Sequence, residues 1–194
     1  QQVREAAIEM MKRFKEAGAL ISFDVNFRGN LWSGAEAKEC IEQILPLVDV
    51  FFCSDSTARL TFLKEGTPEE VMKSFADEYP VSVVAATQRI VHSPKRHSFG
   101  SVIYDARNKT FVKEEMYKDI EVVDRIGSGD AYISGALYGL LSSDFDTEKA
   151  MQYGNAVSAL KNTVPGDLPS ITLHEVEEMI KIHQVGDDGL EMKR

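Results

Sequence analysis

Apolar and polar residues follow one another in short blocks that predict helices and strands in turn. From about Val3 to Ala17, apolar residues recur at helical spacing among Arg, Glu and Lys, and Gly18 ends that helix. Continuous apolar runs then indicate buried strands at Leu20–Asp24, Val50–Cys53 and Val81–Thr87.

The remaining blocks predict further helices and one hairpin. Helices are expected at Gly34–Leu45, from near Thr57, from Thr67-Pro68, at Ala131–Leu141, at Thr147–Asn162, and from Ser170–Thr172 to about Ile182. Phe99–Tyr104 and Thr110–Glu114 predict the hairpin, and the charged tail Gly186–Arg194 is expected to fray. Alternating strands and helices predict a mostly parallel sheet covered on both faces, with an antiparallel hairpin added. Without an internal repeat or linker, we interpret residues 1–194 as a single domain.

Composition narrows the classes of function. The 194 residues are 43% hydrophobic and 27% charged, which is typical of a globular domain with a real core. The net charge of −9 and the lack of a basic run argue against binding to nucleic acid or to an anionic membrane. Cys40 and Cys53 lack CxxC spacing and indicate reduced thiols in a cytoplasmic protein. No apolar run approaches the length of a membrane span.

The stretch Asp124–Ala136 carries the strongest chemical signal. Gly127 and Gly129 form a tight turn that leads directly into an apolar helix, and glycine lets a ligand approach the main chain closely. The first N–H groups of a helix lack intrahelical partners, and the helix dipole adds positive charge there. This arrangement suits a phosphate. Asp130 adds a carboxylate, which a phosphate would repel. A carboxylate at this position therefore indicates a role in proton transfer or in metal binding.

A purely structural explanation of the same stretch stays open. Gly-x-Gly-Asp before a helix is also a turn whose acidic residue stabilises the helix dipole. The stretch is not a Walker loop, because no Gly-Lys-Ser/Thr follows. It is not a Rossmann fingerprint either, because the third glycine is not at the required spacing.

Polar residues at strand ends and turns supply further candidates. Arg28 lies in a loop after Asp24, and its planar guanidinium matches a carboxylate bidentately, although a capped surface loop is the alternative. Ser54 is placed to cap the next helix. Thr87 is expected to end its strand where a nucleotide edge would lie, and Asp167 is either a turn residue or a ligand contact.

The segment Asp124–Ala131 resembles the C-terminal signature of the ribokinase-type (PfkB) sugar kinases, an Asp, two variable residues and Gly-Ala-Gly-Asp. The resemblance implies that Asp130 takes the proton from a sugar hydroxyl, while the amides of Gly127, Ser128 and Gly129 hold the transferring phosphate. Ser128 replaces the common Ala. Arg125-Ile126 replace the common Thr-Thr and are similar to the 2-keto-3-deoxygluconate kinase branch.

Other stretches resemble that branch as well. They are Asp24-x-Asn-x-Arg28 with the following Leu-Trp, the helical face from Asn155 to Lys161, and Pro-Gly-Asp167. The resemblance implies that Arg28 holds the carboxylate of the sugar acid, that Asp167 contacts its hydroxyls and that Asn155 contacts the nucleotide. Ser54 stands where the family has the Asn of Asn-x-x-Glu, near the nucleotide phosphates, so helix capping remains the stronger explanation for it.

The resemblance implies a ribokinase-like three-layer α/β/α sandwich that transfers the γ-phosphoryl group of ATP to a sugar acid, giving 2-keto-3-deoxy-6-phosphogluconate. Mg²⁺ would bind to the nucleotide phosphates and keep mostly water as its other ligands. In some members a monovalent cation such as K⁺ sits behind the anion hole. Asp124 matches that site, but Ile126 replaces a usual Thr, which leaves the ion open. The resemblance covers nearly all of this chain but only the C-terminal part of such a kinase, without the N-terminal part and its lid.

Two alternatives remain at this point. One is a fructokinase-like or ribokinase-like kinase of another sugar or a nucleoside, against which Arg28 and the Pro-Gly-Asp stretch argue. The other is a nucleotide-binding fragment without turnover, because much of the sugar site would lie in the absent part. Apolar sheet surface left exposed by that absence would favour a homo-oligomer.

Overall fold

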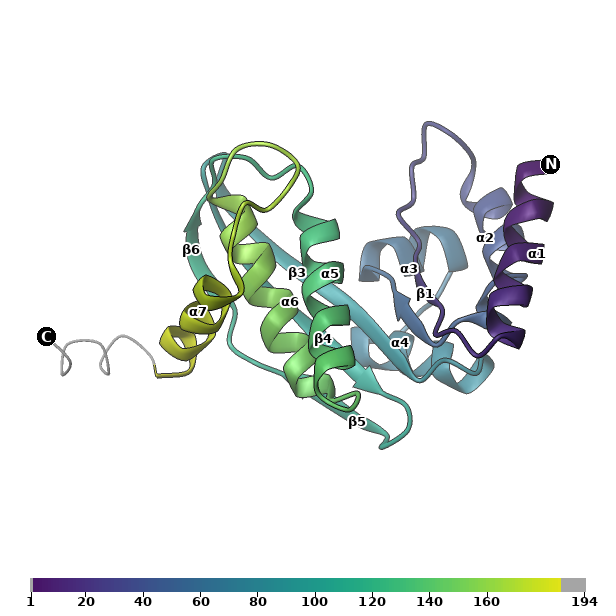
Figure 1. The fold of residues 1–194 in the computed structure, drawn as a ribbon. Coiled ribbons are helices and arrows are strands. Elements are labelled where there is room, and N and C mark those ends of the chain that lie inside the picture. Colours follow the sequence, from purple (N-terminus) through teal and green to yellow (C-terminus); the bar gives the residue numbers. More distant parts are fainter. Residues whose placement is uncertain (1, 186–194) are drawn as a thin grey trace, which may run out of the picture. The chain divides into compact units, whose positions relative to one another are not determined.

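The computed structural model describes residues 2–185, so the predicted fraying of Gly186–Arg194 lies outside the described residues (Figure 1). The chain forms two compact units. Unit 1 comprises residues 1–87 and 102–111, and unit 2 comprises residues 88–101 and 112 onward. Strands β3 (Val83–Ser93) and β4 (Arg96–Asp105) run through both units.

Unit 1 holds the parallel part of the sheet. Its elements are α1 (Gln2–Glu16), β1 (Ser22–Asp24), α2 (Gly34–Glu42), the 3₁₀ helix η1 (Leu45–Leu47), β2 (Val50–Phe52), α3 (Asp55–Phe62) and α4 (Pro68–Glu78). Strand β1 pairs in parallel with β2, and β2 with β3, so that Asp24, Phe52 and Ala85 stand at one level. The carboxyl ends of these strands therefore meet at one edge, where ligands bind in open α/β sheets.

An aromatic cluster lies in the core of unit 1. Phe51 of β2 packs edge-on against Phe75 of α4 with ring centroids 4.9 Å apart, and Phe62 of α3 contacts Phe75 at 5.1 Å. Such edge-to-face pairs add about 0.5–1.5 kcal/mol each beyond the burial of their area. The cluster anchors α3 and α4 on the sheet.

Unit 2 combines an antiparallel part of the sheet with three helices. Its elements are the second half of β3, the first half of β4, the end of β5 (Thr110–Lys113), β6 (Tyr117–Glu121), α5 (Ser128–Ser142), α6 (Thr147–Asn162) and α7 (Leu173–Val185). Strand β6 pairs antiparallel with β4. Helices α5 and α6 approach each other closely at Gly135 and Gly139 of α5. A Cβ added to either glycine would lie 2.6 Å from a backbone oxygen of α6.

Most predicted elements are confirmed, including the helix Thr147–Asn162 and the strands from Thr110 and Val50. The predicted end of a strand at Thr87 is wrong, because β3 continues to Ser93 and β4 returns beside it. The β-branched pair Ile90-Val91 favours this extension. Strand β6 was not predicted. Within residues 2–185, no helix is both long and apolar enough to span a membrane.

Candidate active site

The glycine turn of unit 2 leads into helix α5 as the sequence predicts. Gly127 is the N-cap residue in the left-handed region (φ 74°), and the first helical hydrogen bond runs from Ala131 N to Gly127 O at 2.8 Å. The N–H of Ser128 is used within the turn, since it donates to Arg125 O at 3.1 Å. The N–H groups of Gly129 and Asp130 belong to the first turn of α5, where a helix offers no backbone acceptor.

Space for a ligand differs between the two glycines. A Cβ on Gly129 would meet no atom within 4 Å, whereas a Cβ on Gly127 would collide with Asp167. Asp130 is exposed in the same first turn of α5. An exposed carboxylate and open space therefore lie beside helix N-terminal N–H groups, which is the arrangement required to hold an anion next to a base.

The loop after α6 packs against the turn. Gly166 N donates to Asp124 Oδ2 at 3.1 Å, while Ile126 N donates to Asp124 Oδ1 at 3.0 Å. These two backbone hydrogen bonds are the main reason that the pKa of Asp124 lies below its ordinary value. Asp167 lies on the same loop as Gly166. The structure thus brings Asp167 to the glycine turn from Asp124 to Gly129, which is the candidate phosphate turn.

Helix α6 holds the turn from the other side. The hydroxyl of Ser158, which is fully buried, donates to Ser128 O at 3.0 Å, and Val123 N donates to Asn162 O at 2.8 Å. Sequence reasoning included Ser158 and Lys161 in the helical face from Asn155 to Lys161 without giving either a role, and it did not name Asn162. The available signal was a run of polar residues on a helix face that is otherwise buried.

Asn155 lies on the same helix but is fully buried. Its amide Nδ2 donates to Glu114 Oε1 at 2.6 Å. Burial raises the pKa of Glu114, and the Asn155 hydrogen bond opposes that rise. The predicted contact of Asn155 with a nucleotide stays a prediction, because in this structure its amide serves Glu114.

Positive charge gathers near the start of the turn, which sequence reasoning also missed. Burial and the neighbouring cation of Arg125 lower the pKa of the Arg89 guanidinium. His97 is buried, and burial followed by the charges of Arg89 and Arg125 lowers its pKa. Arg89 and Arg125 thus lie near enough for their charges to interact, next to a turn that also carries Asp124 and Asp130.

In unit 1, Arg28, Ser54 and Thr87 follow the aligned strand ends of β1, β2 and the parallel part of β3. Arg28 is exposed, and its Nη1 donates to the backbone oxygens of Asn26 and Phe27, at 3.2 Å each. These weak local bonds shape the loop and leave most of the guanidinium donors available. Thr87 lies within β3 rather than at its end, and it is half-buried.

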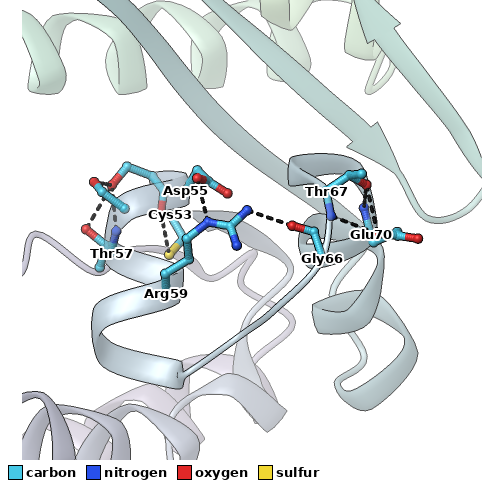
Figure 2. Close-up of polar contacts among 9 residues, drawn as sticks. Cys53, Asp55, Thr57, Arg59, Gly66, Thr67 and Glu70 are labelled. Atoms are coloured by element: carbon cyan, nitrogen blue, oxygen red, sulfur yellow. Dashed lines mark hydrogen bonds and ion pairs between the residues drawn. The ribbon is translucent and has the colours of Figure 1, made fainter.

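Ser54 performs the capping role expected for it. Its Oγ accepts a hydrogen bond from Thr57 N at 3.2 Å and donates to Thr57 Oγ1 at 2.8 Å. Figure 2 shows the surrounding contacts, in which Arg59 links Asp55 at 2.9 Å to the carbonyl of Gly66 at 2.8 Å. The hydroxyl of Ser54 is thus engaged by its own helix, and its predicted contact with nucleotide phosphates stays a prediction.

The arrangement of His, Cys, Asp and Glu side chains determines whether the protein could bind a divalent metal directly. Among residues 2–185, no group of three or more His, Cys, Asp or Glu side chains could hold a metal ion. The expectation that Mg²⁺ would arrive on nucleotide phosphates and keep mostly water ligands stays a prediction.

Comparison with known proteins identifies the family. Residues 1–172 match the pfkB family of carbohydrate kinases. The chain belongs to this family. A 2-dehydro-3-deoxygalactonokinase of Haloferax volcanii is 31% identical over 97% of this chain and 55% of its own length. A 2-dehydro-3-deoxygluconokinase of Bacillus subtilis is 28% identical over 90% of this chain and 50% of its own.

Another relative is named for a different sugar. A fructokinase of Escherichia coli is 26% identical over 75% of this chain and 44% of its own length. The crystal structure of a 2-dehydro-3-deoxygluconokinase from Thermotoga maritima matches with a TM-score of 0.87 at 23% identity, over 94% of this chain and 56% of that one. The fold is therefore ribokinase-like α/β. This chain spans about half the length of the curated relatives it matches.

Proposed function

We propose that this chain is the nucleotide-binding part of an ATP-dependent kinase of a sugar acid, with 2-keto-3-deoxygluconate as its substrate. The observation that carries the proposal is Asp130, exposed in the first turn of α5 beside the open space at Gly129. The pfkB family membership makes phosphoryl transfer the relevant chemistry, and the family uses ATP with a divalent metal.

In the proposed reaction, Asp130 accepts the proton of a sugar hydroxyl as the hydroxyl oxygen attacks the γ-phosphorus of ATP. The bond from that phosphorus to the β-phosphate oxygen breaks, and ADP leaves. The amides at the start of α5 stabilise charge on the migrating group, while Arg89 and Arg125 attract the phosphates. Mg²⁺ bound to the nucleotide would neutralise phosphate charge. Positioning and electrostatic stabilisation supply most of the catalysis in such a site.

Arg28 supports a sugar acid as the substrate. Its guanidinium is exposed, and among residues 2–185 it makes two weak local hydrogen bonds through Nη1, so its fork is available for a carboxylate. Asp167, which lies against the turn, is proposed to contact the hydroxyls of the sugar. A kinase of neutral sugars is the second candidate, because the E. coli fructokinase is also a relative. We further propose a cytoplasmic location, and self-association through apolar surface.

A coupled ADP-release assay tests the function. It compares 2-keto-3-deoxygluconate with fructose, using this chain alone and an enzyme completed to the length of its relatives with the N-terminal part of one of them. We expect calorimetry to show binding of Mg–ATP to the chain alone, and turnover of the sugar acid mainly in the completed enzyme. Equal turnover of fructose would favour the second candidate, and no nucleotide binding at millimolar concentration would refute the proposal.

A further inference from the structure

Lys161 is a fully buried lysine at the end of α6, with a side chain that is 0% exposed. Its Nζ donates to the backbone oxygens of Asp124 at 3.1 Å and Val164 at 3.2 Å. A buried ammonium is costly unless its N–H groups find acceptors and its charge is balanced. The contacts of Lys161 give two of its three N–H groups carbonyl acceptors, which indicates a built position rather than an accidental one.

The two carbonyls belong to the two segments that form the candidate phosphate turn. Asp124 begins the turn, and Val164 begins the loop that carries Gly166 and Asp167. The carboxylate of Asp124 accepts hydrogen bonds from Ile126 N and Gly166 N. After those bonds, the positive charge of Lys161 also contributes to the lowered pKa of Asp124. The ammonium thus joins both segments through their carbonyls, and it lies near enough to the carboxylate of Asp124 to favour its charged form.

A bound monovalent cation would compete with this arrangement. Cations such as K⁺ replace their hydration shell with carbonyl oxygens. Two carbonyl oxygens behind the turn, those of Asp124 and Val164, already accept from one ammonium. A second positive charge at the same oxygens would meet the repulsion of a buried like charge at contact distance. The residues present therefore do not fit a monovalent-cation site behind the turn.

We propose that Lys161 is a built-in cation, which holds the phosphate turn in place and makes a monovalent cation unnecessary. Lys161 is a positioning residue, because it acts through the backbone of Asp124 rather than on the nucleotide. The effect on stability depends on unit 2 alone, whereas the effect on rate rests on the proposed kinase function.

Thermal unfolding in different salts tests the proposal directly. The melting temperature of the wild-type chain is measured in potassium, sodium and tetramethylammonium chloride at equal ionic strength. We expect the same melting temperature in all three salts. In Lys161→Ala, the freed carbonyls and the vacated volume should lower the melting temperature in tetramethylammonium chloride and allow K⁺ to recover part of the loss. A K⁺-specific rise for the wild type would overturn the proposal.

Lys149→Ala is the matched control on the same helix, because Lys149 is exposed and its ammonium makes a long hydrogen bond to Gln152 Oε1, at 3.4 Å. It should show neither a large loss nor K⁺ recovery. If Lys161→Ala does not fold, Lys161→Met keeps the length of the side chain, and the wild-type salt comparison decides the question by itself. An unchanged melting temperature in Lys161→Met would also overturn the proposal.

Kinetics separate this proposal from the kinase function. The completed wild-type enzyme should release ADP at the same rate in potassium and tetramethylammonium chloride. A K⁺-specific increase in its rate would overturn the role of Lys161. If no ADP is released in any salt, the kinase function fails, while the melting temperatures still test the built-in cation.

Discussion

Asp167 lies directly against Gly127. A Cβ on Gly127 would stand 2.4 Å from Asp167 Oδ1 and 2.2 Å from its carbonyl oxygen. Such distances leave no room for any side chain at position 127, so the turn and the loop after α6 form one packed structure. Gly129, two residues further on, faces open space instead. The two glycines of the motif therefore have different physical roles, one in packing and one in access.

Gly127→Ala should destabilise the protein. Its φ of +74° is unfavourable for a residue with a Cβ, which costs about 1–2 kcal/mol before the collision with Asp167 is added. Urea unfolding should therefore show a clear loss of stability. An unchanged unfolding midpoint would mean that the loop moves away from the turn at little cost.

Gly129→Ala should have the opposite effect on stability. The position is helical and open, so alanine is expected to stabilise the protein by roughly 0.5–1 kcal/mol. Affinity for Mg–ATP should fall, because the methyl group occupies the space by which a phosphate would approach the amides. Calorimetry measures that affinity. Unchanged nucleotide binding with raised stability would show that no ligand needs the glycine at 129.

Local sequence signals were sufficient for much of this site. Gly127, Gly129 and Asp130 were recognisable because a glycine turn and a helix start are encoded within a few residues. Caps were recognisable for the same reason, and both Ser54 and Thr67 accept hydrogen bonds from the backbone of the helices they precede.

Contacts between distant segments could not be predicted in this way. Gly166 reaches Asp124 across 42 residues, and Lys161 reaches it across 37. Neither spacing produces a periodic pattern, so the role of these residues becomes visible only when α6 packs on α5. The extension of β3 beyond Thr87 was missed for a similar reason, because its exposed half is stabilised by the returning strand β4.

Arg28→Ala, in the completed enzyme, should raise the KM for the sugar acid strongly and leave the affinity for ATP almost unchanged. Loss of a bidentate charge-assisted pair should cost about 2–4 kcal/mol in kcat/KM. Steady-state kinetics with both substrates measure the effect. Arg28→Lys is the matched control, which keeps the charge but removes the planar fork and should recover only part of the loss. If a neutral sugar suffers as much as the acid, Arg28 is structural.

Glu114→Gln should stabilise the protein at neutral pH. Burial raises the pKa of Glu114 above its ordinary value of 4.5, although the Asn155 hydrogen bond and His183 oppose the rise. A raised pKa means that the folded state favours the neutral form. The contribution of Glu114 to stability is therefore fully present below the ordinary pKa and is lost as the pH rises through the folded-state pKa.

Urea unfolding at acidic and neutral pH tests this expectation. The advantage of Glu114→Gln over the wild type should grow as the pH rises and vanish in acid, where both side chains are neutral. The amide oxygen of glutamine can still accept the hydrogen bond of Asn155, so the contact itself is kept. An equal effect of the substitution at both pH values would assign it to packing rather than to charge.

Asp130→Asn separates the two roles of Asp130, as the base of a phosphoryl transfer and as an acidic residue in the first turn of a helix. Removal of the base should lower kcat roughly 10²–10⁴-fold in the completed enzyme, because an amide cannot take the hydroxyl proton. Affinity for ATP should hold or improve, since a negative charge beside the phosphates is lost. Stability should change by only a few tenths of a kcal/mol, because Asp130 is exposed and the dipole effect is small at the surface.

The control is Asp146→Asn at the N-cap of α6, where Oδ1 accepts from Glu148 N at 2.8 Å and Lys149 N at 3.3 Å. Asparagine caps a helix about as well as aspartate, so Asp146→Asn should leave kcat and melting temperature nearly unchanged. A large loss of kcat in Asp130→Asn alone, with normal melting temperatures in both variants, assigns the loss to proton transfer. A near-normal kcat in Asp130→Asn would refute the proposed mechanism, because the reaction would then proceed without the carboxylate. The role of Asp130 would be limited to stabilising the start of the helix.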